Sequence, residues 1–107
     1  MNPIVDAQPI DFTRFRDGVR ARVDEAVGNE PPVSFEDAAC LWRRGKLRVT
    51  LVAADDGSTV LASRTAADLF RVSNTLGMRF PLNESGIAEC SQIVVGWLNN
   101  STLYLQS

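Results

Sequence analysis

The chain has 107 residues, a formal net charge of −2 and a pI near 5.0, which fits one small globular domain. Hydrophobic residues make up 45% of the sequence and charged residues 22%, which argues against a disordered or fibrous chain. The acidic balance argues against a wholly basic protein that coats nucleic acid. The absence of histidine argues against His-based acid–base catalysis, the usual catalytic triads and metal sites built on imidazole.

The first part of the chain predicts an extended arm followed by a helix. Residues 1–10 contain two prolines and show no hydrophobic period, so we expect them to be extended. Apolar residues then recur at helical spacing over 12–27, with Asp11 as the N-cap. Gly28, Asn29 and the Pro31–Pro32 pair mark the end of this helix.

The next segment predicts a short second helix, a turn and a β-hairpin. Ser34 precedes "FEDAACLW" (35–42), which we interpret as a helix with acidic residues in its first turn. After the turn "RRGK", the period changes to two over 47–63, with Asp56–Gly57 as the hairpin turn. We expect Leu47, Val49 and Leu51 to face the helices, and Val52 and Val60 to lie on the other face or at an interface.

The last third predicts two more helices and two short extended segments. These are a third helix at about 65–76, "MRFPL" as an extended piece, a fourth helix capped by Asn83 or Ser85 that ends near Leu98, and "TLYL" as a terminal strand. The fold class is therefore α+β, a small antiparallel sheet with helices on one face in the order α-α-β-β-α-(β)-α-β. We expect one domain over 1–107.

One stretch, "TAADLFRVSNTL", resembles the core of a helix-turn-helix of the excisionase type, in which an "AADLL" helix is followed by a "GVS" turn. The resemblance covers about a dozen residues and implies a DNA-binding element at 65–80. The chain departs from that pattern where Arg71 replaces the turn glycine, and where Gly77 and Pro81 interrupt the second helix. A single continuous amphipathic helix is the preferred interpretation.

The two cysteines, Cys40 and Cys90, lie beside apolar neighbours and are expected to be small buried hydrophobes. A disulfide or a reactive thiol is the alternative. The N-terminus lacks the basic and apolar regions of a secretory signal, and no apolar run is long enough to span a membrane. We therefore expect a cytoplasmic protein with reduced thiols and no membrane partner.

The sequence offers little for catalysis. Its glycines form neither nucleotide-binding fingerprint, and its three adjacent carboxylate pairs diverge on any regular element. We expect no enzyme activity, no cofactor and no metal.

A basic cluster, "WRRGKLR", is the clearest candidate for a binding surface. Two arginines near the start of the first helix oppose its dipole and are candidates to extend that surface. The alternative for both groups is ordinary solvated charge. The predicted partner-binding residues are Trp42, Arg43, Arg44, Lys46, Arg48, Arg14 and Arg16. Charge changes at Arg43 and Arg44 are expected to leave the domain folded.

These features favour a non-enzymatic protein-binding module, with Trp42 as an anchor and the arginines facing an acidic partner surface. The size and charge are similar to those of small phage or mobile-element inhibitors and of secretion chaperones, an analogy at the level of class alone. A DNA- or RNA-binding regulator and an obligate homodimer are the alternatives. Salt-dependent retention on heparin or DNA separates the first alternative from protein binding, and light scattering separates the second.

Overall fold

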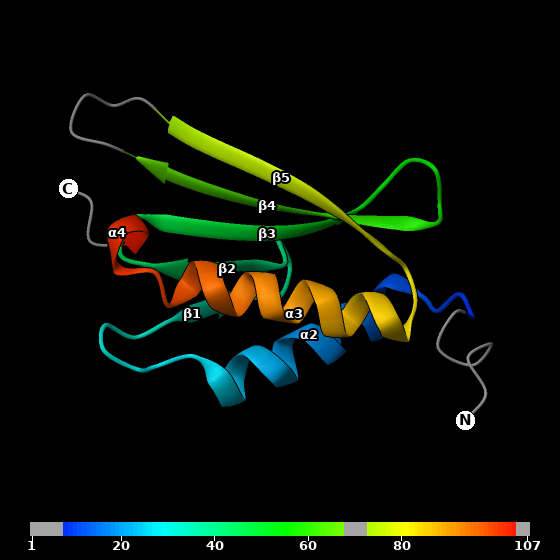
Figure 1. The fold of residues 1–107 in the computed structure, drawn as a ribbon, viewed down its shortest axis with the longest axis horizontal. Helices are drawn as coiled ribbons and strands as arrows, with labels where there is room; N and C mark the ends of the chain where they lie inside the picture. Colours follow the sequence, from blue (N-terminus) through cyan, green and yellow to red (C-terminus); the bar gives the residue numbers. More distant parts are fainter. Residues whose placement is uncertain (1–7, 68–72, 105–107) are drawn as a thin grey trace.

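The computed structural model describes residues 8–67 and 73–104. Its sheet has five strands, antiparallel throughout and in chain order from β1 to β5. Helices cover one face of this sheet, so the predicted α+β class is confirmed (Figure 1). The elements are α2 (Phe12–Ala26), β1 (Ser34–Glu36), β2 (Leu41–Arg44), β3 (Leu47–Ala53), β4 (Thr59–Ala67), β5 (Ser73–Pro81), α3 (Glu84–Leu98) and α4 (Ser101–Tyr104).

The two long helices, α2 and α3, lie side by side with their N-termini at the same end (Figure 1). Asp11 caps α2 through a side-chain oxygen that accepts from the Arg14 amide, and Asn83 caps α3 by accepting from the Gly86 amide. Both helices were expected from the sequence at nearly these bounds, and both are confirmed. The parallel arrangement places two positive helix dipole ends together at one end and two negative ends together at the other.

The predicted helix over 35–42 is wrong, because this segment forms two strands joined by a turn. Phe35 of β1 pairs with Trp42 of β2, and their ring centroids lie 4.8 Å apart. Cys40 closes the turn with a φ of 47°, a conformation that a regular helix does not contain. The contact between the half-buried Phe35 and the fully buried Trp42 outweighs the helical propensity of the intervening alanines and acidic residues.

The predicted helix over 65–76 is also wrong where the structure describes it. Residues 65–67 belong to β4 and residues 73–76 to β5, which pair with each other from Thr59↔Pro81 to Ala67↔Ser73. Residues 68–72 lie outside the described part of the chain. A helix-turn-helix at 65–80 is therefore contradicted, since both ends of the segment are β-strand. The extended interpretation of "MRFPL" is confirmed for the part in β5.

The core lies between the sheet and the two long helices. Leu47, Val49 and Leu51 of β3 are fully buried and face the helices, as expected from their alternation. Val52 lies on the other face and is 54% exposed. Val60, expected beside Val52, is instead buried, because the register pairs it with Ala53, on the same side of the sheet as Leu51.

The expected terminal strand "TLYL" is wrong, because residues 101–104 form the helical turn α4. The Asn100 side-chain oxygen accepts from the Thr102 amide, and the Asn100 carbonyl accepts from the Leu103 amide. Asn100 thus starts a new turn directly after the end of α3. Over the described residues the order is one helix, five strands and two helices, which differs from the mixed order of helices and strands expected from the sequence.

Candidate partner-binding surface

The strand β2 divides the predicted basic cluster between the two faces of the sheet. Successive side chains of a strand point to opposite faces, so Trp42 and Arg44 face the helices while Arg43 faces away from them. Trp42 is 1% exposed and Arg44 is 3% exposed. Both were expected on a partner surface, and both are part of the interior instead.

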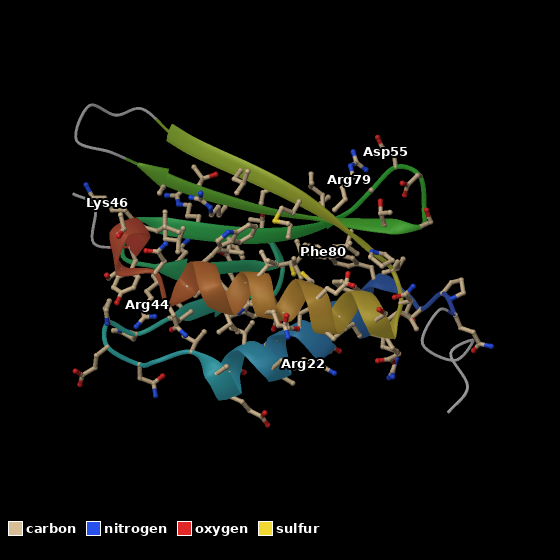
Figure 2. All side chains as sticks on the ribbon, in the orientation of Figure 1. Arg22, Arg44, Lys46, Asp55, Arg79 and Phe80 are labelled. Atoms are coloured by element: carbon tan, nitrogen blue, oxygen red, sulfur yellow. The ribbon has the colours of Figure 1, made fainter. Side chains whose placement is uncertain are left out.

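The buried guanidinium of Arg44 is occupied by contacts within the protein. Its Nη1 donates to the Leu98 carbonyl (2.5 Å) and to the Asn99 side-chain oxygen (3.2 Å), and its Nη2 donates to the Glu30 carbonyl (3.1 Å). The ring of Tyr104 lies 4.2 Å from the guanidinium carbon. Arg44 therefore stabilises the C-terminal end of α3 and does not face a partner (Figure 2).

Arg14 and Arg16 belong to the helical layer, on the other side of the sheet from Arg43. Arg14 forms an ion pair with Glu84 and so joins the first turns of α2 and α3. Arg16 pairs with the adjacent Asp17 at 3.1 Å. The structure does not bring these two arginines together with the "WRRGKLR" cluster, and their charges are balanced by neighbouring carboxylates.

The remaining members of the cluster gather on the face of the sheet that the helices leave open. Arg43 of β2 and Arg48 of β3 lie directly opposite each other in the antiparallel register, and both are exposed. Lys46, in the turn between these strands, is exposed next to them. Across the described residues, none of these three side chains takes part in an ion pair. We call Arg43, Lys46 and Arg48 the open-face cluster.

The rest of the open face changes character away from the open-face cluster. The next row holds the exposed Glu36 of β1, Leu41 of β2 and the half-buried Thr50 and Ser63, and the row beyond it holds Val52 and Leu61. The face is therefore basic at one end, mixed in the next row and apolar beyond it.

The far end of the open face combines opposite charges. Arg79 of β5 lies opposite Leu61, and Asp55 and Asp56 stand in the nearby turn between β3 and β4. Figure 2 shows Arg79 and Asp55 close together at one end of the sheet and Lys46 at the other. An open hollow of about 450 Å³ lies among these side chains and Val52.

The pKa of Asp56 is set mainly by hydrogen bonds within the turn that this residue stabilises. The Ser58 amide donates to its carboxylate at 2.9 Å, the Thr59 hydroxyl at 2.9 Å and the Thr59 amide at 3.0 Å. These hydrogen bonds, that of Ser58 first, lower the pKa of Asp56, and Arg79 adds a smaller effect in the same direction. The carboxylate is thus kept ionised by the turn itself.

The two thiols are buried and unpaired, as expected. Burial raises the pKa of Cys40 to about 11 and that of Cys90 to about 12, so both stay protonated near neutral pH. Protonated, buried thiols are poor nucleophiles and poor metal ligands. Within the described ranges, no three Cys, Asp or Glu side chains gather in a geometry that could hold a metal ion.

Sequence reasoning correctly placed Val52 on the open face but missed Arg79 and Leu61 there. The available signal was the alternation in "LGMRF", where Leu76, Met78 and Phe80 share one face and Arg79 the other. Interpreting 65–76 as a helix hid this alternation, and with it the first part of strand β5.

Comparisons of the chain with protein-family models, with curated proteins and with solved structures find no match. No helix in the part of the chain that the structure describes combines the length and the apolar character that a membrane crossing requires.

Proposed function

We propose that this protein is a non-enzymatic binding module, of the inhibitor or adaptor kind, whose open sheet face engages an acidic group on a partner protein. The observation that carries this proposal is the pairing of Arg43 with Arg48. Like charges placed directly opposite each other on a sheet are destabilising, and no carboxylate within the described residues forms an ion pair with either arginine. A partner carboxylate between the two guanidinium groups would supply the missing negative charge.

The surroundings of the open-face cluster favour a protein partner over a nucleic acid. A long polyanion needs a continuous basic stripe, whereas this face ends in Asp55 and Asp56 and the chain is acidic overall. Between the two ends lie hydroxyl groups and the aliphatic side chains of Val52 and Leu61. A mixed surface of this kind suits a folded protein with one local acidic site.

The test compares two double variants that each remove two positive charges. Arg43→Gln with Arg48→Gln removes two of the three charges of the open-face cluster, and Arg16→Gln with Arg22→Gln removes two charges from α2, where Arg22 is exposed and Arg16 is half-buried. Each purified protein is immobilised and used to capture partners from an extract of the source cells, before and after nuclease treatment. Both variants should remain folded, because exposed charges contribute little to stability.

We expect the first variant to lose a protein partner that the wild type and the second variant retain, in a nuclease-resistant and salt-sensitive manner. Equal capture by both variants would remove the open-face cluster from the proposal. Capture that disappears on nuclease treatment would show that the partner is a nucleic acid and contradict the proposal.

A further inference from the structure

Among residues 8–67 and 73–104, no further strand pairs with the edge of the sheet that β5 forms. The strand β5 is nine residues long, whereas the opposite edge, β1, has three residues and directly follows a segment with Pro31 and Pro32. Short edge strands and nearby prolines are common ways to prevent pairing with another chain. Along β5 the sequence carries one charge, Arg79, and one proline, at its last residue, Pro81.

The pairing of β4 with β5 shows which backbone N–H and C=O groups of β5 have no partner in the described sheet. The Leu82 amide donates to the Ser58 carbonyl, so residues at even positions of β5 direct their backbone groups toward β4. The backbone groups of Gly77 and Arg79 therefore point away from the sheet. Pro81, which has no N–H, occupies the same outward-pointing set, as expected for proline in an edge strand.

Two large hydrophobic side chains flank Gly77 on the helix side of this edge. Leu76 is 42% exposed and Met78 is 37% exposed, and each lies opposite a residue of β4 in the register, Arg64 and Ala62. Figure 1 shows that β5 diverges from α3 toward its N-terminal end. Exposed apolar side chains next to an unpaired strand edge indicate an interaction surface.

We propose that a second copy of this chain covers this edge, with β5 pairing antiparallel to its counterpart about a two-fold axis at Gly77. In that register the outward-pointing backbone N–H and C=O groups of Gly77 lie opposite those of Gly77 in the second copy, so the two strands can exchange hydrogen bonds. Leu76 of each chain then lies opposite Met78 of the other, as a close pair on the helix side. This proposal is independent of the open-face cluster.

Gly77 fits the position on such an axis. Glycine inside a strand often marks a place where another backbone approaches closely. A Cβ at this position would meet the Leu61 side chain at 3.3 Å, a tight contact that a flexible side chain can relieve. Packing within the chain therefore does not by itself require glycine here, whereas close approach of a second strand favours it.

The length of the β5 edge sets the expected affinity of the proposed dimer. Nine residues span about 31 Å, and a depth of about 15 Å gives roughly 450 Å² on each copy. The total of about 900 Å² lies just below the usual lower limit of about 1,000 Å² for stable interfaces. We therefore expect a dimer with a dissociation constant in the micromolar range, which forms and dissociates with concentration.

The first test is sedimentation velocity of the full chain over a concentration series from about 1 to about 100 μM, which spans the expected transition. The series compares the wild type, Leu76→Lys with Met78→Lys, and Leu76→Lys with Met78→Glu. Val52→Lys is the control, because it places the same charge on an exposed hydrophobic of the opposite face. Circular dichroism confirms that each variant is folded.

We expect the wild type and Val52→Lys to dimerise, and the double-lysine variant to dimerise at least about 100-fold more weakly, because like charges then face each other. The lysine–glutamate variant should recover dimerisation, since each lysine faces a glutamate of the other copy. A wild type that is monomeric throughout, a double-lysine variant that dimerises normally, or a lysine–glutamate variant that does not recover would each overturn the proposal.

A second measurement covers the case in which these charged variants fail to fold. Single variants Leu76→Cys and Met78→Cys are oxidised separately and as a mixture, and the native thiols are buried and slow to react. The proposed register predicts a covalent dimer in the mixture and almost none in either variant alone, because only unlike positions face each other. Equal cross-linking in all three samples, or none in any, would contradict the register.

Discussion

The Nη1 atom of Arg44 donates a 2.5 Å hydrogen bond to the carbonyl oxygen of Leu98, in the last turn of α3. The side-chain oxygen of Asn99 accepts from the same nitrogen. The side-chain nitrogen of Asn99 donates to the Ala26 carbonyl at the end of α2. One buried cation thus lies where the negative ends of two parallel helices meet. This position explains why the buried Arg44 tolerates the absence of a carboxylate among its described contacts.

Replacing Arg44 with Met should lower the free energy of unfolding by about 2–4 kcal/mol, because the Leu98 and Glu30 carbonyls lose their donors while they stay partly buried. Arg43→Met is the matched control, since the neighbouring side chain is exposed, and it should change stability by less than about 0.5 kcal/mol. Urea unfolding followed by circular dichroism measures both. Equal midpoints for the two variants would show that Arg44 does not stabilise the helix ends.

Replacing Leu51 with Ala should cost about 2–5 kcal/mol, because the side chain is fully buried between sheet and helices. Val52→Ala, one residue along the same strand, should cost less than about 1 kcal/mol, because more than half of that side chain is exposed. Thermal unfolding of both variants tests the alternation of β3. A larger loss for Val52→Ala would contradict the assigned faces.

Gly45 and Gly57 both have positive φ, yet their replacement by Ala should have different consequences. At Gly57 (φ 72°) a Cβ meets nothing, so the cost is the backbone strain of about 1 kcal/mol. At Gly45 (φ 57°) a Cβ would lie 2.2 Å from the Tyr104 carbonyl oxygen, so α4 must also move. Unfolding experiments should show a clearly larger loss for Gly45→Ala, and similar losses would mean that α4 does not pack on this turn.

The raised pKa values of the two thiols predict that the folded protein loses stability in alkaline solution. The folded pKa values of Cys40 and Cys90, about 11 and about 12, lie above the ordinary value of 9.0. Above pH 9 the unfolded chain therefore releases thiol protons that the folded chain retains. The stability present below pH 9 is lost as the pH rises toward these folded values.

Urea midpoints between pH 8 and pH 10.5 measure this alkaline loss. The variant Cys90→Ala removes one of the two buried thiols and should show a shallower decline with pH than the wild type. Identical slopes in the two proteins would mean that the Cys90 thiol ionises equally well in the folded and unfolded chain. The wild-type thiols should also label slowly in native buffer and quickly after denaturation.

The long helices and the central hairpin were predictable because their signals are local. Asp11 and Asn83 cap segments with a clear helical period, and the β3 alternation is continuous across Leu47, Val49 and Leu51. The pairing of Phe35 with Trp42 was not predictable in this way, because it depends on a turn that places Cys40 at positive φ. The contact between the buried Trp42 and the half-buried Phe35 then overrides a locally helical composition.

The candidate surface was predicted only in part for the same reason. A helix over 35–42 followed by a turn leaves Arg43 and Arg44 equally exposed, whereas a strand directs them to opposite faces. Arg48 and Lys46 were correctly expected to be exposed beside Arg43. The interior position of Arg44 depends on the docking of α3 and α4, and Trp42 packs on Phe35 of the neighbouring strand; no local sequence pattern encodes either contact.

Arginine-selective labelling followed by mass spectrometry, on the free protein and on its complex with the captured partner, tests the proposed surface most directly. In the free protein we predict fast modification of Arg43 and Arg48 and slow modification of Arg44. In the complex, Arg43 and Arg48 should become protected while Arg22, on the exposed side of α2, keeps its rate. Unchanged labelling of Arg43 and Arg48 in the complex, or fast labelling of Arg44 in the folded protein, would contradict the proposed surface.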